Sequence, residues 1–169
     1  MAWRKPKECL LSTTKGRKEG RGGRMACFFV AIAHERGVVL CEQYTCKSVT
    51  GEFIAEFIKK HFPTAFCKTK KLTAKMFLQD GDPKQVSAKA KKRIEKMVYT
   101  YFHIPARSPD FNPIENMFHV ARRQLKKDDI ELKIENENYE QFSSRVKKTI
   151  ESIDISYINR TIESMKQRM

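Results

Sequence analysis

The alternation of hydrophobic and polar positions predicts an ordered succession of strands and helices from residue 25 onward. Residues 25–33 are nearly all apolar, which favours a strand buried on both faces, and "HERG" then turns the chain into a second strand at 38–44. Two further apolar runs predict strands at 76–80 and 98–104. The preceding stretch, "KGRKEGRGGR", shows no period and is typical of an irregular arm.

Helical patterns alternate with the later strands. The segment "TGEFIAEFIKKHF" places its apolar residues on one helical face, and Ser87 predicts the N-cap of a second helix. Further helices are predicted at 113–127, at about 137–152 and at about 155–167. The order β, β, α, β, α, β, α followed by a helical tail predicts an α/β domain with a mixed sheet.

Length and composition limit the class of protein. The 169 residues suffice for one domain with a sizeable core, and a hydrophobic fraction of 40% favours a folded chain. No apolar run approaches the ~20 residues that a membrane span needs, so no membrane partner is expected. The five cysteines form no C-x-x-C pair, and reduced thiols in a cytoplasmic or nuclear protein are their simplest interpretation.

The net charge changes this picture most. A formal charge of +14 with an isoelectric point near 9.7 indicates a polyanionic partner, most often nucleic acid. Basic residues cluster in residues 1–24, between Lys84 and Lys96, and between Arg122 and Lys127. Each cluster could also be an ordinary solvated face, but three on one chain favour phosphate binding. The predicted DNA-binding residues are Lys84, Lys89, Lys92, Arg93, Arg107, Arg122 and Arg123.

Two carboxylates are candidates for chemistry. Asp80 ends a predicted strand, where α/β sheets bind ligands, and Glu115 opens a helix after the next strand, with thirty-four residues between them. A helical crossover of that kind could bring both side chains into one cleft, where they would bind Mg²⁺ or Mn²⁺. The alternative for Glu115 is a role in helix capping. In it, Asn112 is the N-cap, Pro113 is the first helical residue and Glu115 completes a capping box.

The blocks around these carboxylates resemble a known family. "FLQDGDPKQ" and "PARSPDFNPIEN" are similar to two signature blocks of the mariner superfamily of cut-and-paste DNA transposases, in the Tc-type branch with the same spacing. The resemblance implies a ribonuclease H-like fold, with Asp80 and Glu115 as catalytic residues and metal ligands. It also implies Mg²⁺ or Mn²⁺ as cofactor, DNA as partner in place of a small-molecule substrate, and a nuclear location.

The departures from the family pattern concern the first catalytic aspartate. In the family it lies on a strand shortly before the segment matching "WRKP", whereas here Trp3 already stands near the start. The resemblance therefore predicts a catalytic domain truncated at its N-terminus, lacking its first strand and catalytically defective. Its predicted parts are a basic glycine-rich arm at 1–24, a partial ribonuclease H-like domain at 25–127 and a helical extension at 128–169.

Other interpretations remain open at this level. The chain could be a non-catalytic nucleic-acid-binding remnant, a repurposed transposon protein, or a reading frame in a degraded element. It could be a monomer or a homodimer. Cys41, Cys46, His61 and Cys67 have a superficially finger-like spacing, but a strand position for Cys41 and an amphipathic helix around His61 favour core or surface residues over zinc ligands.

Overall fold

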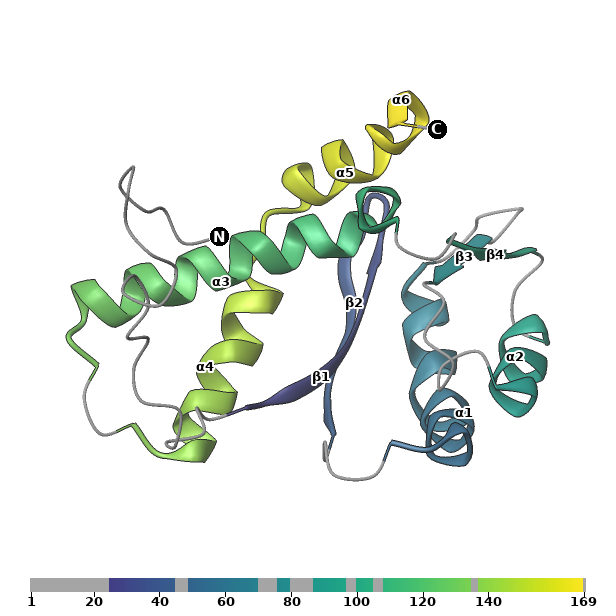
Figure 1. Cartoon of the computed structure of the whole chain (residues 1–169), viewed down its shortest axis with the longest axis horizontal. Coiled ribbons are helices and arrows are strands. Elements are labelled where there is room, and N and C mark those ends of the chain that lie inside the picture. The colour runs from purple at the N-terminus through teal and green to yellow at the C-terminus, as the bar shows by residue number, and fades with distance from the viewer. Residues whose placement is uncertain are drawn as a thin grey trace, which may run out of the picture.

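The computed structural model describes residues 25–44, 49–69, 76–79, 87–96, 100–104, 108–134 and 137–168. Its first half contains two strand pairs and two helices (Figure 1): β1 (Cys27–Ala33), β2 (Gly37–Tyr44), α1 (Gly51–Lys68), β3 (Met76–Gln79), α2 (Ala88–Glu95) and β4 (Thr100–His103). Its second half is helical: a 3-10 turn η2 (Pro109–Phe111), then α3 (Pro113–Glu131), α4 (Tyr139–Glu151), α5 (Ile155–Glu163) and α6 (Met165–Arg168). The predicted succession of strands and helices is confirmed over these residues.

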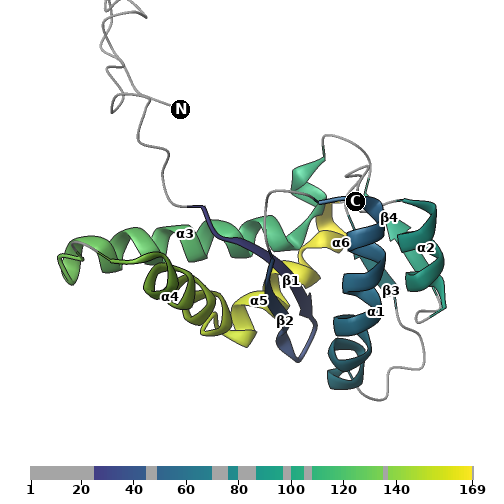
Figure 2. The ribbon, with the colours of Figure 1, turned by 90° about the horizontal axis from the view of Figure 1, so that it is seen from below.

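The hairpin of β1 and β2 stands between two layers of helices. Figure 1 and the perpendicular view in Figure 2 both place α3 and α4 on one side of it and α1 on the other. The side chains of β1 alternate between these layers, because successive strand residues point to opposite faces. Phe29 packs in the cluster centred on α1, whereas Phe28 and Val30 pack against the α3–α4 cluster that contains Met117 and Ile150.

The hairpin turn requires a glycine. Glu35 and Gly37 both have positive φ, at 60° and 69°, and Arg36 N donates to Ala33 O at 3.2 Å. A Cβ atom at Gly37 would lie 2.9 Å from Cγ1 of Ile155, so α5 leaves no room for a side chain there. The turn is also fastened to α5, because the backbone N–H of Glu35 donates to Asn159 Oδ1 at 2.8 Å.

Helix α1 is longer than its amphipathic pattern predicts, because it continues past Pro63 to Lys68. A proline inside a helix removes one backbone hydrogen bond and normally costs ~3 kcal/mol. Packing offsets that cost here: Phe62 and Ala65 are buried, and Phe66 meets Phe77 of β3 edge-on at 6.1 Å between ring centroids. Burial beyond the proline therefore determines where this helix ends.

The strands belong to a mixed α/β arrangement and, over the described residues, lie in two two-stranded sheets. β1 pairs with β2 antiparallel, and β3 pairs with β4 in parallel, with α2 between them in the chain. These antiparallel and parallel strand directions agree with the predicted hairpin followed by a helical crossover.

The cysteines only partly follow the expectation of reduced thiols. Cys41 and Cys67 are free, but Cys27 is disulfide-bonded. Over the described ranges, none of the helices is both long and apolar enough to cross a membrane.

Candidate nucleic-acid interface

Glu115 lies in the first turn of α3 with its side chain exposed. The helix start follows the predicted cap: the side chain of Asn112 accepts from Ile114 N at 3.3 Å, and Pro113 occupies the first helical position. The carboxylate of Glu115 forms no hydrogen bond or ion pair with any described residue, so the alternative of a capping box is not realised here. A complete box does form at α4, between Asn138 and Gln141.

Glu115 belongs to a stripe of exposed side chains along α3. His119, Arg122 and Lys126 follow it at intervals of four, three and four residues and are also exposed. These intervals place all four on one face of a helix, since each turn contains 3.6 residues. Met117 and Ala121, on another face, are buried against the hairpin. We call these four residues the α3 stripe.

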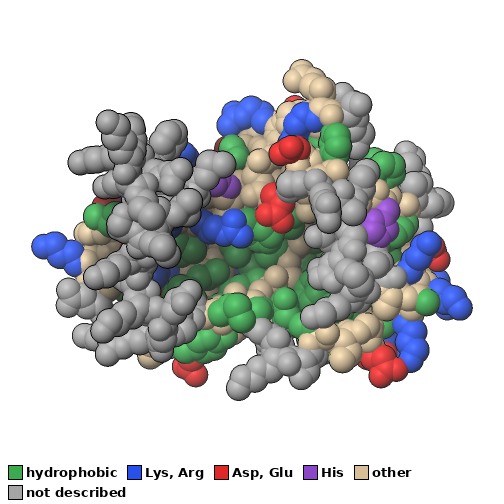
Figure 3. All heavy atoms as spheres, viewed as in Figure 1, with side chains coloured by type: hydrophobic (Ala, Val, Ile, Leu, Met, Phe, Trp, Pro, Cys, Tyr) green, Lys and Arg blue, Asp and Glu red, His purple; other side chains and the backbone are tan. Residues whose placement is uncertain are grey.

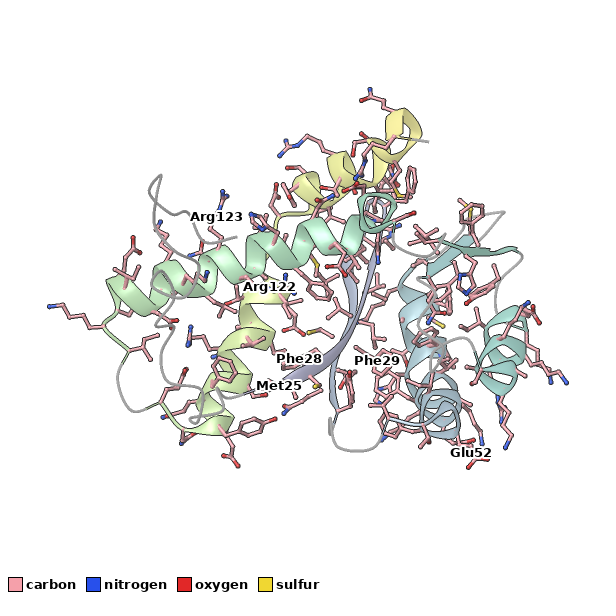
Figure 4. The ribbon with its side chains drawn as sticks, viewed as in Figure 1. Met25, Phe28, Phe29, Glu52, Arg122 and Arg123 are labelled. Carbon is pink, nitrogen blue, oxygen red and sulfur yellow. The ribbon has the colours of Figure 1, made fainter. Side chains whose placement is uncertain are left out.

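Arg122 and Arg123, both predicted to bind nucleic acid, are free cations in the described structure. Figure 4 shows them leaving the middle of α3 in different directions, and neither forms an ion pair with a described residue. Lys127 differs, because it pairs with Glu131 at 3.6 Å one turn further on. Over the described ranges, the positive charge on the middle of α3 therefore has no acidic partner.

The predicted basic residues on α2 have a different environment. Lys89 is ion-paired with Glu52 of α1, and Arg93 lies 3.8 Å from Glu56 of the same helix. In Figure 3, blue side chains over α2 lie beside red ones. The hydrogen bond from Lys89, and then its charge, hold the pKa of Glu52 below its ordinary value. Only Lys92 and Lys96 on this helix lack an ion-pair partner among the described residues.

These residues line a hollow of about 460 Å³ between α1 and α2. Acidic side chains of α1 form part of its wall, including Glu52 and Glu56. An entering phosphate would have to approach these carboxylates or displace them from their lysine and arginine partners. The hollow is therefore a weaker anion site than its lysine content suggests.

A network between α3 and α4 fixes the far end of α3. Arg145 Nε and Nη2 donate to the two carboxylate oxygens of Glu137, each at 2.8 Å, and Nη2 also lies 2.9 Å from Asp129 of α3. The guanidinium lies 5.8 Å from the ring centre of Phe142. Glu137 and the other contacts raise the pKa of Arg145 above its ordinary value, so the cation is permanent. No pattern in the sequence indicates a role for Arg145, because its partners come from separate segments.

Three predicted site residues, Asp80, Lys84 and Arg107, lie outside the described residues. The shared cleft of Asp80 and Glu115 therefore stays a prediction. β3 ends at Gln79, directly before Asp80, and Ile104 N donates to Gln79 O at 2.9 Å beyond the β3–β4 pairing. The described residues contain no group of three or more His, Cys, Asp or Glu placed to hold a metal.

The zinc alternative gains no support from the described residues. Cys41 is buried, and this burial raises the pKa of its thiol to about 11, with Glu151 adding to the effect. A zinc ligand must be a thiolate, which that pKa disfavours. The ring of His61 stacks on Phe57 with centroids 4.4 Å apart, and Cys67 is exposed. Cys46 lies outside the described residues.

Known proteins resemble this chain in sequence and in fold. A search of protein-family models finds no match. In sequence, the chain is 29% identical over 93 residues to the transposable element Tcb1 transposase of Caenorhabditis briggsae, covering 55% of this chain and 32% of the relative. In structure, it matches the Mos1 transposase catalytic domain solved with raltegravir and Mn, with a TM-score of 0.66. The two are 14% identical in sequence, and the match covers 85% of this chain and 76% of that chain.

The chain has a ribonuclease H-like fold, similar to that of the Mos1 transposase catalytic domain. A second match, the Mos1 mariner paired-end complex with Mn, has a TM-score of 0.72 and 16% identity over 98% of this chain and 47% of that chain. Both the resemblance and the fold expected from the sequence are thereby confirmed. The chain spans about a third of the curated relative and about half of the transposase in that complex.

Proposed function

We propose that this chain is a transposase-derived, nuclear DNA-binding domain that holds the phosphate backbone along α3. The observation that carries the proposal is the α3 stripe, in which a carboxylate and two cations without an ion-pair partner among the described residues share one exposed helical face. The Mos1 relatives add support, since one was solved as a paired-end complex with the left transposon end.

The spacing of the stripe suits a nucleic-acid strand. A helix rises 1.5 Å per residue, so Arg122 lies roughly 10 Å along the axis from Glu115 and Lys126 roughly 16 Å. Successive nucleotides of one DNA strand are ~3.4 Å apart along the duplex axis, so Arg122 would meet a phosphate about three nucleotides from the one nearest Glu115. Cations at these positions would hold the strand while the carboxylate faces one phosphate.

Within this proposal, Asp80 and Glu115 are the two carboxylates that would hold Mg²⁺ or Mn²⁺. Glu115 fits that role, because it is exposed, unpaired and close to the positive end of the α3 dipole, which stabilises its charged form. A bound divalent ion would supply Lewis-acid activation of water and of the scissile phosphate. The two Mos1 structures solved with Mn support this choice of ion.

We further propose that residues 1–169 alone do not cut or join DNA at a useful rate. In the family that the sequence resembles, a third carboxylate completes the two-metal site, and the described residues contain no group of three or more His, Cys, Asp or Glu that could hold a metal. Two carboxylates would hold one ion weakly and with several waters, as Mg²⁺ is usually held. The domain would then bind DNA without completing the reaction.

Supercoiled-plasmid nicking in Mg²⁺ and in Mn²⁺ tests the catalytic part, with Asp80→Ala and Glu115→Ala as matched variants. We expect no nicking above that of the variants, together with DNA binding by all three proteins. Robust nicking that both substitutions abolish would overturn the claim of defective catalysis and leave DNA binding intact. A homodimeric DNA-bound form belongs to the same proposal, and sedimentation of the complex tests it.

A further inference from the structure

The first turn of α3, which carries Glu115, follows directly on the short 3-10 turn η2. This turn is three residues long, and Phe111 N donates to Ser108 O at 3.1 Å across it. Glu115 N then donates to Asn112 O at 3.1 Å. Because both bonds are local, they shape the segment but do not place it relative to the rest of the domain. Contacts from distant parts of the chain have to do that.

Arg168 of α6 supplies such a contact. Its Nη1 donates to the carbonyl oxygen of Asp110 in η2, and its Nη2 donates to Thr161 O at 3.1 Å and to Ser164 Oγ at 3.0 Å. One guanidinium therefore joins α5 to the turn before α3, across 58 positions of sequence. A planar guanidinium holds its donors in a fixed fork, so these bonds set the direction of the turn as well as its distance from α5.

Helix α5 is itself firmly anchored. Ile158 is fully buried, with 0% of its surface exposed. The hairpin turn holds the helix at two further points: Glu35 N donates to Asn159 Oδ1 at 2.8 Å, and His34 Nε2 lies 2.8 Å from Glu163 Oε1. A bond from Arg168 to α5 therefore ties η2 to the packed part of the domain.

A second contact joins α5 to the first turn of α3. The hydroxyl of Tyr157 lies 3.5 Å from the backbone oxygen of Asn116, the residue after Glu115. In Figures 1 and 2, α5 and α6 lie on the side of α3 where that helix begins. The chain is thus held at one point before Glu115 and at another point after it.

We propose that Arg168 is a positioning residue for the Glu115 carboxylate, acting through the carbonyl oxygen of Asp110. The inference rests on the proposed function, in which Glu115 binds a divalent ion. A metal ligand has to be held within roughly 0.5 Å of its working position, and a carboxylate in the first turn of a helix moves with the start of that helix. Without Arg168, the binding of an ion would have to order η2 as well, which lowers affinity.

Mn²⁺ binding to the full 169-residue chain tests the proposal. Paramagnetic broadening of the backbone amide signals of residues 114–117 reports an ion at Glu115 and gives its dissociation constant. The test variants are Arg168→Ala and Arg168→Lys. Arg160→Ala is the matched control, because Arg160 is an exposed cation of α5 and its loss changes the net charge equally. Glu115→Gln tests the proposed metal role separately, and urea denaturation is measured on every variant.

We expect Arg168→Ala to weaken Mn²⁺ binding at Glu115 by about tenfold, the lower end of what loss of a supporting residue around a metal site costs. Arg168→Lys should recover part of this loss, because an ammonium can donate to Asp110 O but cannot reproduce the fork to α5. Arg160→Ala should change the affinity by less than about twofold, since an exposed charge acts weakly in solvent.

Unchanged Mn²⁺ affinity in Arg168→Ala would overturn the proposal. That holds even if the urea midpoint falls, because a residue that only stabilises the fold lowers the midpoint and leaves the folded chain's affinity intact. An equal loss in Arg160→Ala would also overturn it, by tracing the effect to charge. If Mn²⁺ does not broaden these signals in the unaltered chain, or if Glu115→Gln leaves the broadening unchanged, the metal role of Glu115 fails, and this inference fails with it.

Discussion

Helices α2 and α3 carry comparable basic clusters, but more of the cations on α2 are paired with acidic side chains. On α2, Lys89 and Arg93 face Glu52 and Glu56 of α1. On α3, Arg122 and Arg123 have no acidic partner among the described residues, because the neighbouring buried face is apolar. Counting lysines and arginines therefore overstates the anion-binding surface, since the acids on the adjacent helix decide which charges are free.

The largest expected effect on DNA affinity distinguishes the contribution of α3 from that of α2. Arg122→Ala/Arg123→Ala should weaken binding of a 30-base-pair duplex by about tenfold or more, because each free phosphate contact releases condensed counterions. Lys89→Ala/Arg93→Ala removes the same number of cations and should change affinity by less than about threefold. Fluorescence anisotropy at fixed salt measures both. Equal losses would mean that pairing with α1 does not decide which cations bind.

Loss of the Arg145 network that holds α4 against α3 should have an intermediate effect, in this case on the free energy of unfolding. Arg145→Ala leaves Glu137 without its two-pronged partner, so the free energy of unfolding should fall by about 1–2 kcal/mol, discounted because the Arg145 side chain is 18% exposed. Urea denaturation measures this loss. Arg145→Lys keeps the charge but not the paired donors and should recover less than half of it. Full recovery by lysine would show that charge alone holds the two helices together.

The smallest effect comes from releasing the α2 cations. Glu52→Gln/Glu56→Gln should raise DNA affinity by about two- to threefold, because Lys89 and Arg93 lose competing carboxylates. A depressed pKa means that Glu52 stays charged until pH falls below its ordinary value, so the Lys89–Glu52 pair should be unchanged between pH 8 and pH 5. Anisotropy on the double variant tests the first expectation. Unchanged affinity would show that α2 lies away from the DNA.

The sequence predicted the elements well and their contacts less well. The strands and helices follow from periods of two and 3.6 residues, and even the α3 stripe can be found from its four-three-four spacing. The neutralisation of Lys89 could not be predicted, because Glu52 lies 37 residues earlier in the chain and only the packing of α1 on α2 brings them together. Helix α1 likewise passes Pro63 because of tertiary burial.

Some features of the candidate site could likewise be predicted from the sequence, and others could not. Exposure of Glu115 follows from its place in the first turn of a helix that buries Met117 and Ala121. The absence of a capping box at Asn112 does not follow, since Asn138 and Gln141 form one with the same spacing. The Arg145 network joins α4 to the end of α3 and to Glu137, and no local pattern indicates it.

The salt dependence of DNA binding tests the central claim most directly. For the unaltered chain, the association constant should fall by about 10³ between 50 and 200 mM salt if about six phosphates are contacted. The logarithm of the association constant falls linearly with the logarithm of the salt concentration. The magnitude of this slope should decrease by about two in Arg122→Ala/Arg123→Ala, and by less than about half a unit in Lys89→Ala/Arg93→Ala. Binding that ignores salt, or a slope that the α3 substitutions leave unchanged, would contradict the assignment of DNA binding to α3.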